Sequence, residues 1–157
     1  MKKYIVTTTI QPPTEATIKY SQMEGWQLVV VGDKKTPHIE YENINCEYLH
    51  PDDQEDINKE LSDAIGWNCI QRRNLGFLYS YLKGADVMAT VDDDNIPYDS
   101  WGKEIYIGEK IEVNLFESSN GYFDPLSVTE HNNLWHRGYP IEMVASKNNV
   151  KHLGTEH

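Results

Sequence analysis

Three consecutive aspartates, Asp92, Asp93 and Asp94, directly follow the apolar segment Val87–Val91. Like charges this close repel one another, and burying them is costly unless a cation neutralises them. Mg²⁺ and Mn²⁺ take oxygen ligands and often share one or two carboxylates with the phosphates of a substrate. The cluster therefore predicts a metal-bound diphosphate at the carboxyl end of a strand. The alternative is a solvated turn, since Asp is common after strands.

Two arginines, Arg72 and Arg73, stand upstream of the aspartates on a segment with helical periodicity. Its apolar residues recur at roughly helical spacing, which predicts that they form one buried face: Ile70, Phe77, Leu78, Tyr81 and Leu82. The helix would bring positive charge close to the aspartates. The alternative for Arg73 is an ordinary surface position.

The remaining elements of the first hundred residues alternate between strand and helix patterns. Strands are expected at Tyr4–Thr9, Trp26–Val31, Ile44–Leu49 and Val87–Val91, and helices at Glu15–Met23 and at Gln54–Ile65 with Asp52 or Asp53 as its cap. This order predicts an α/β fold with a mostly parallel sheet flanked by helices. Ligands of such sheets gather at the carboxyl ends of the strands. Thr8, Thr9 and Asp33 are expected to join the aspartates there.

The second part of the chain is less regular. Val113–Phe116 is predicted as a strand, whereas Trp101–Ile111 fits either a strand or a short helix. Length predicts one domain over residues 1–147. Residues 148–157 have little core character and are predicted to form a flexible tail.

Composition excludes several function classes. A formal net charge of −11 argues against a nucleic-acid or anionic-membrane partner. Cys46 and Cys69 lack CxxC spacing, so reduced core thiols are expected rather than a zinc site. No apolar run approaches the length of a membrane span, and Met1 leads directly into a strand pattern without a signal peptide. These features predict a cytoplasmic protein.

Two groups of motifs resemble known glycosyltransferases. Arg73-Asn74-Leu75-Gly76-Phe77 and Thr90-Val91-Asp92-Asp93-Asp94 are similar to motifs of the GT-A fold, a Rossmann-like fold with a DxD motif. Phe123-Asp124-Pro125 and Arg137-Gly138-Tyr139-Pro140 resemble segments of the reversibly glycosylated polypeptide family, which includes UDP-arabinopyranose mutases. STELLO-type glycosyltransferases show a related pattern. The resemblance spans the chain from Ile5 to about Met143.

The resemblance implies a role for each matching residue. Asp92 and Asp94 would be the outer members of DxD and would contact the ribose and a Mn²⁺ or Mg²⁺ ion, while Asp93 could share either role. Arg73 would approach the phosphates or organise the aspartates. Thr8, Thr9 and Asp33 would border the nucleobase and ribose of the nucleotide.

The residues proposed for catalysis lie in the second part of the chain. Arg137 matches the arginine that becomes glycosylated in the mutases, although it could equally pin a loop. Asp124 and Glu117 are the nearby candidates for a general base. Together these features predict a metal-dependent glycosyltransferase with a nucleotide-sugar donor, most simply a UDP-sugar, and an unknown sugar or glycan acceptor. The alternatives are a UDP-sugar mutase and a non-catalytic nucleotide-sugar-binding domain.

Overall fold

The computed structural model describes residues 1–119, 121–147 and 149–156, and it divides into two compact units, Met1–Trp101 and Gly102–His157. The boundary at Trp101 falls inside the range that the sequence predicts as one domain. Single-domain folding stays a prediction, because a division into compact units does not say whether the units fold together. Each unit is described by itself.

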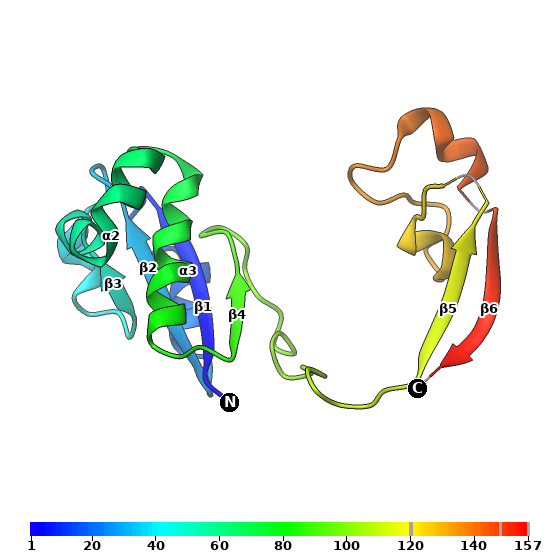
Figure 1. Cartoon of the computed structure of the whole chain (residues 1–157), viewed down its shortest axis with the longest axis horizontal. Helices are drawn as coiled ribbons and strands as arrows, with labels where there is room; N and C mark the ends of the chain where they lie inside the picture. Colours follow the sequence, from blue (N-terminus) through cyan, green and yellow to red (C-terminus); the bar gives the residue numbers. More distant parts are fainter. Residues whose placement is uncertain (120, 148, 157) are drawn as a thin grey trace. The chain divides into compact units, whose positions relative to one another are not determined.

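The first unit contains a four-stranded parallel sheet (Figure 1). The strands are β1 (Lys3–Thr9), β2 (Trp26–Gly32), β3 (Glu47–Leu49) and β4 (Val87–Thr90), in the order β3-β2-β1-β4. Because β1 and β2 are central, they are buried on both faces and read as nearly continuous apolar runs. Helices flank the sheet, so the predicted Rossmann-like α/β fold is confirmed.

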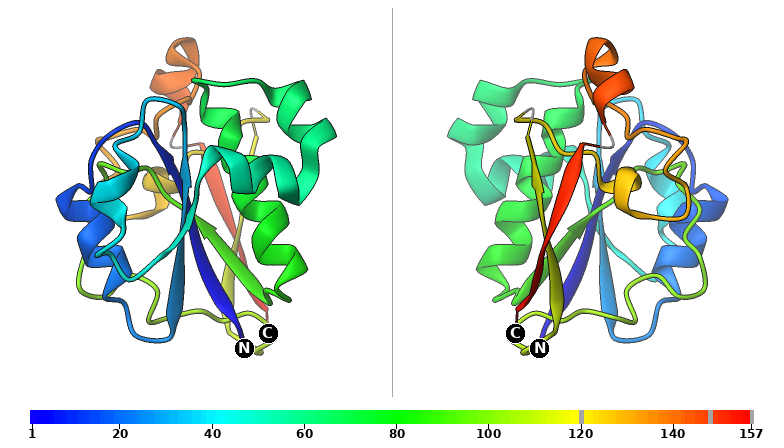
Figure 2. Two further views of the ribbon diagram at one scale, coloured as in Figure 1. Left: turned by 90° about the vertical axis from the view of Figure 1, so that its left-hand side faces the viewer. Right: turned by 90° about the vertical axis from the view of Figure 1, so that its right-hand side faces the viewer.

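Helices cover both faces of this sheet (Figure 2). Helix α1 (Glu15–Ser21) packs on one face, and α2 (Pro51–Ile65) and α3 (Arg73–Leu82) pack on the other. Short 3₁₀ turns, η1 (His38–Tyr41) and η2 (Ile70–Arg72), complete the connections. The core accordingly has two parts, one centred on Ile5, Leu28 and Val30 and the other on Val6, Val29 and Val31.

The face that α3 buries differs from the predicted one. Of the residues predicted to be buried, Ile70, Tyr81 and Leu82 are exposed, and Phe77 and Leu78 are half-buried, with Phe77 packed on the core. Leu75 and two small residues, Gly76 and Ser80, are buried. A Cβ on Gly76 would lie 2.5 Å from Cγ1 of Val6 and 2.7 Å from Cγ2 of Val31. The helix therefore approaches the sheet by its smallest side chains, a contact that an apolar periodicity does not reveal.

Helix α2 begins earlier than predicted and contains a break. His50, rather than Asp52 or Asp53, is the N-cap, and Asp53 completes a capping box with it. Asn58 has a non-helical backbone, and its side-chain oxygen accepts a hydrogen bond from the Leu61 amide at 2.8 Å. Asn58 thus acts as an internal cap between two helical segments.

Aromatic residues join η1, β3 and the start of α2. Tyr41 stacks on Tyr48 with ring centroids 4.8 Å apart, and the Tyr48 hydroxyl lies 2.5 Å from Nδ1 of His38. The rings of His38 and His50 meet edge to face at 4.3 Å. Burial, and then the nearby His50, lower the pKa of His38, while Asp52 acts in the opposite direction.

The second unit contains two antiparallel strands, β5 (Val113–Ser118) and β6 (Val150–Glu156). Two 3₁₀ segments, η3 (Pro125–Val128) and η4 (Ile141–Ser146), lie between them. Within the range 148–157, predicted to be a flexible tail, residues 150–156 form β6, because β5 supplies backbone partners; residues 148 and 157 lie outside the described residues. Within 101–111, neither the strand nor the helix expected there forms, and Gly102 and Gly108 have positive φ.

In the part of the chain that the structure describes, every helix is too short or too polar to cross a bilayer.

Replacing Gly76 by alanine should destabilise the first unit by about 1–3 kcal/mol, because the new methyl group would overlap two buried valines of the sheet. Urea unfolding followed by circular dichroism measures the loss. Asn74→Ala, on the exposed side of the same helix, is the control and should change stability little. Equal stabilities for the two variants would contradict the close helix–sheet contact.

Stability should fall as the pH drops through the titration of His38. A histidine with a lowered folded-state pKa stabilises the fold fully above its unfolded pKa of about 6.5, and this contribution is lost as the pH falls through the folded pKa. Urea unfolding should be measured above the unfolded pKa and below the folded pKa of His38. Between these two conditions the free energy of unfolding should fall less for His38→Gln than for the wild type. Parallel pH profiles would rule out His38 as the source.

Candidate functional site

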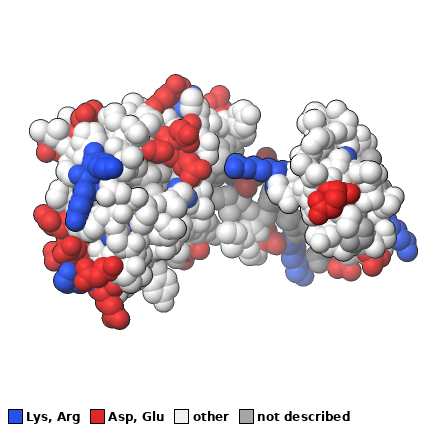
Figure 3. All heavy atoms as spheres, turned by 90° about the horizontal axis from the view of Figure 1, so that it is seen from above, with Lys and Arg blue, Asp and Glu red and all other residues white. Residues whose placement is uncertain are grey.

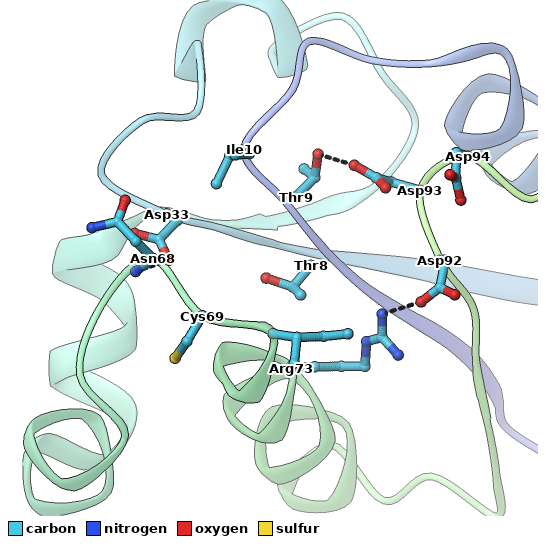
Figure 4. A pocket seen from close by; sticks show the side chains of 11 residues that line it. Thr8, Thr9, Ile10, Asp33, Asn68, Cys69, Arg73, Asp92, Asp93 and Asp94 are labelled. Carbon is cyan, nitrogen blue, oxygen red and sulfur yellow. Dashed lines mark hydrogen bonds and ion pairs between the residues drawn. The ribbon is translucent and has the colours of Figure 1, made fainter.

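A cavity of about 390 Å³ lies at the carboxyl ends of β1, β2 and β4 (Figure 4). Its wall contains every residue that the sequence assigns to nucleotide and metal binding: Thr8, Thr9, Asp33, Arg73, Asp92, Asp93 and Asp94. The structure therefore brings these strand ends together as expected, while the roles of the individual residues stay predictions.

The three aspartates differ in what holds them. Asp92 accepts from Nη2 of Arg73 at 2.7 Å, and Asp93 accepts from the hydroxyl of Thr9 (Figure 4). No hydrogen bond or ion pair is recorded between the exposed Asp94 carboxylate and any other described residue. The repulsion expected within the cluster is thus relieved at two carboxylates, while Asp94 keeps all its oxygen lone pairs available.

The two arginines have separate surroundings. Arg72 is fully buried and donates to Gln54, Ser62 and Gly66, and its guanidinium lies 3.7 Å from the ring centroid of Trp67. Desolvation lowers the pKa of Arg72, although several neighbouring groups, Asp33 first among them, act in the opposite direction. This arginine is part of the core and does not line the cavity.

Arg73 lines the cavity and joins α3 to the end of β4. Its side chain is 15% exposed and donates from Nη1 to the hydroxyl of Thr90 at 2.9 Å, besides its ion pair with Asp92. Its Nε is buried and has no hydrogen-bond partner among the described residues. Arg73 thus organises the aspartate, which is one of its two predicted roles, and its approach to a phosphate stays a prediction.

Asp33 forms the opposite wall and is 2% exposed. Its carboxylate accepts from the amides of Lys34 and Asn68 at 2.6 and 2.7 Å. Asn68 has a positive φ of 57°, which an Asn tolerates better than most residues. The carboxylate therefore fixes the segment before α3 as well as ending β2, a structural task that is compatible with a contact to a ligand.

Sequence reasoning missed part of the wall. Ile10, Asn68, Cys69 and Ile70 also line the cavity. Cys69, for which a reduced core thiol is predicted, is a free, half-buried cysteine; the residue lines the cavity, and its Sγ lies 3.6 Å from the carbonyl oxygen of Ile65 (Figure 4). No local pattern marks these residues, because they reach the cavity only through the turn that Asp33 holds.

The cavity offers carboxylate oxygens, which suit Mg²⁺ or Mn²⁺. Within the described ranges no group of three or more His, Cys, Asp or Glu side chains is placed to hold a metal by itself. Asp92 and Asp94 would therefore suit only an ion that takes most of its ligands from a diphosphate and water, and Oδ2 of Asp92 also accepts from Nδ2 of Asn95 at 3.4 Å. The metal itself stays a prediction.

Asp124 and Arg137 lie in the second unit. Asp124 is fully buried; its Oδ1 accepts from the amides of Leu126 and His136 at 3.1 and 3.2 Å, and its Oδ2 has no partner among the described residues. Arg137 is exposed beside the positive-φ residue Gly138. Asp124 therefore holds the loop that carries Arg137, and the catalytic roles predicted for both residues stay predictions.

Acidic side chains are prominent on the first unit. Figure 3 views the molecule from above, the side toward which the strands of the first sheet end, and shows several groups of acidic atoms on this unit. A local Arg73 and a cation would be needed to attract a phosphate to such a face.

Comparison with known proteins finds distant relatives. No protein-family model matches the chain. Among curated proteins it is similar to the probable glycosyltransferases STELLO2 and STELLO1 of Arabidopsis thaliana, with 23% and 22% identity over 167 aligned residues. The alignments cover 96% of this chain and 21% of each relative, so the chain spans about a fifth of their length. The similarity supports a distant, glycosyltransferase-like relationship.

Replacing Arg72 should lower the free energy of unfolding much more than replacing Arg73. Arg72→Ala should lower the free energy of unfolding by about 2–4 kcal/mol, because it leaves a cavity and removes donors from the buried oxygens of Gln54 and Ser62. Arg73→Ala should change it by less than about 1 kcal/mol, since its ion pair is with an exposed carboxylate. Urea unfolding measures both, and equal losses would contradict the assignment.

Proposed function

We propose that the first unit binds a nucleotide sugar with a divalent cation, and that the protein transfers the sugar to an acceptor. The observation that supports this most directly is the cavity at the strand ends, where Asp92, Asp94 and Arg73 share one wall. The distant similarity to probable glycosyltransferases supports the same reaction class.

The roles proposed in the cavity follow from the charges of a diphosphate leaving group. Bound Mn²⁺ or Mg²⁺ would neutralise charge that develops on the leaving diphosphate. Carboxylate oxygens of Asp94 and Asp92 would hold that ion. Arg73 keeps Asp92 in place, and the N–H donors of its guanidinium that Thr90 and Asp92 do not use would contribute positive charge beside the diphosphate.

The opposite wall is proposed to receive the nucleoside. Thr8 and Thr9 end β1, and Asp33 ends β2 beside Asn68. Apolar atoms of Ile10 and Ile70 lie in the same wall, which suits the flat face of a base. The choice of uracil rests on the resemblance to families that use UDP-sugars.

A UDP-sugar mutase is the second candidate. The segment Arg137-Gly138-Tyr139-Pro140 favours it, because the corresponding arginine is glycosylated in the family that this segment resembles. Asp124 is proposed as the base in either reaction. Ring-form exchange of a UDP-pentose separates a mutase from a transferase, and metal-dependent hydrolysis of the donor separates an enzyme from a nucleotide-sugar-binding domain.

Calorimetric titration of the full chain with UDP and with GDP tests the binding proposal, in Mn²⁺ and then in EDTA. UDP should bind in Mn²⁺ and lose most of its affinity in EDTA. Asp94→Ala should weaken binding about tenfold or more, because it removes the carboxylate that other protein groups leave unpaired.

Asp56→Ala is the matched control, since Asp56 is an exposed aspartate on α2 outside the cavity. Its affinity should equal that of the wild type. An affinity for UDP that does not change in EDTA, or that is the same in Asp94→Ala as in the wild type, would refute the metal-bound diphosphate. A folded protein that binds neither nucleotide would refute the nucleotide-sugar site and favour a solvated turn.

A further inference from the structure

Two hydroxyl groups of α1 contact the aspartate segment on either side of Asp94. The Thr14 hydroxyl donates to the backbone carbonyl of Asp93. The Tyr20 hydroxyl donates to the backbone carbonyl of Asn95 at 3.1 Å. The two carbonyls belong to the residues directly before and after Asp94. Asp94 carries the only carboxylate of the cluster that contacts no described side chain. Its position is therefore constrained through the backbone of the residues on either side.

We propose that these two hydroxyls, here called the α1 clamp, are the positioning groups for the cation-binding carboxylate of Asp94. The inference rests on the proposed function, because it assigns a task to α1 at the same site. Asp94 then needs no side-chain partner, and its carboxylate remains free while its backbone is fixed. Neither Thr14 nor Tyr20 lines the cavity, so both would act through Asp94 and neither would touch the ligand.

The hydrogen-bond capacity of Thr14 explains why a hydroxyl stands at this position. Its oxygen accepts from the Thr17 amide at 3.1 Å as the N-cap of α1, and it lies 3.0 Å from the Thr17 hydroxyl. Because it donates its one proton to Asp93, the Thr17 hydroxyl must donate to Thr14. An aspartate would also cap the helix, but an ionised carboxylate has no proton to give to the carbonyl.

Tyr20 suits the same task by its burial. Its ring is 3% exposed and packs edge to face on Trp101 at 5.2 Å, so the hydroxyl has little freedom to move. Burial, and then the charge of Asp92, raise the pKa of the Tyr20 phenol. The phenol therefore stays protonated at neutral pH and remains a donor.

The third tie comes from β1 and involves the middle aspartate. Thr9 donates to the carboxylate of Asp93 and accepts from the Gln11 amide at 2.9 Å. Asp93 thus uses its carbonyl for α1 and one carboxylate oxygen for β1. In this arrangement Asp93 is an anchor, and the cation is left to Asp92 and Asp94.

Tyr20→Phe tests the clamp with little risk to folding, because it removes one hydroxyl and keeps the ring. Tyr79→Phe is the control: Tyr79 is half-buried against the core on the other face of the sheet, and its hydroxyl donates to the carboxylate of Glu47 at 2.9 Å, away from the aspartate segment. The Mn²⁺-dependent affinity for UDP should fall about three- to tenfold in Tyr20→Phe, the effect of about one hydrogen bond, and stay unchanged in Tyr79→Phe.

Hydrogen exchange in the metal-free protein gives a readout that needs no ligand. Amides of residues 92–96 should exchange faster in Tyr20→Phe than in Tyr79→Phe, because the segment has lost one of its ties. Thr14→Val should have the same effect, and Thr14→Ser should restore wild-type exchange and affinity, since serine keeps both the cap and the donor.

The outcomes separate the clamp from the proposed function. Wild-type binding with equal affinities in Tyr20→Phe and Tyr79→Phe overturns the clamp and leaves the nucleotide site standing. Absence of wild-type binding overturns the site, and with it the cation role of the clamp, whatever the exchange shows. Unchanged exchange in both Tyr20→Phe and Thr14→Val overturns the positioning of the segment even where binding is seen.

Discussion

The buried guanidinium of Arg72 is the interaction on which the site depends. It donates to Oε1 of Gln54 from Nε at 2.9 Å, and to the carbonyls of Ser62 and Gly66 at 3.1 and 3.2 Å. Gln54 in turn donates to the carbonyls of Gly32 and Leu49, the last residues of β2 and β3. A buried charge is tolerated only when such partners replace water. One network therefore joins two strand ends to α2 and the start of α3.

The placement of the cavity follows from that network. With Arg72 fixed inward, Arg73 as the next residue is directed to the strand ends, where it meets Thr90 and Asp92. The aspartate segment is thus held by α3 on one side and by α1 and β1 on the other. Preorganisation of this kind spares a bound ion the cost of ordering its ligands.

Much of the fold could be predicted from the sequence because parallel strands have a strong apolar signature. The strand at Trp26–Gly32 and the strand ending before Asp92 are visible as apolar runs, and their carboxyl ends must share one edge of the sheet. The buried face of α3 was predicted only in part, because Gly76 and Ser80 bury little apolar surface and allow a close approach to the sheet instead. The helix caps His50 and Asn58 were not predicted either, because apolar periodicity marks neither residue.

The charged residues of the site could be predicted from the sequence, whereas the residues that position them could not. Consecutive acids and a nearby arginine attract attention by residue type. Tyr20 and Gln54, by contrast, look like ordinary helix residues, and Thr14 looks like a helix N-cap with no further contact. Asn68 and Cys69 reach the cavity only through a turn whose geometry depends on Asp33. Such contacts depend on residues far apart in the chain, so a local pattern does not contain them.

The opposite surroundings of two adjacent arginines restrict how the length of the chain can vary. Loops between elements ordinarily accept insertions and deletions. The connection from Gly66 to Arg72 is fixed at both ends and in its middle, where Asp33 holds Asn68. A single insertion before Arg72 would shift Arg72 to the position from which Arg73 lines the cavity and would leave the buried position to a residue without the guanidinium. Homologues that keep the site are therefore expected to keep the length of this short connection even where they change its residues.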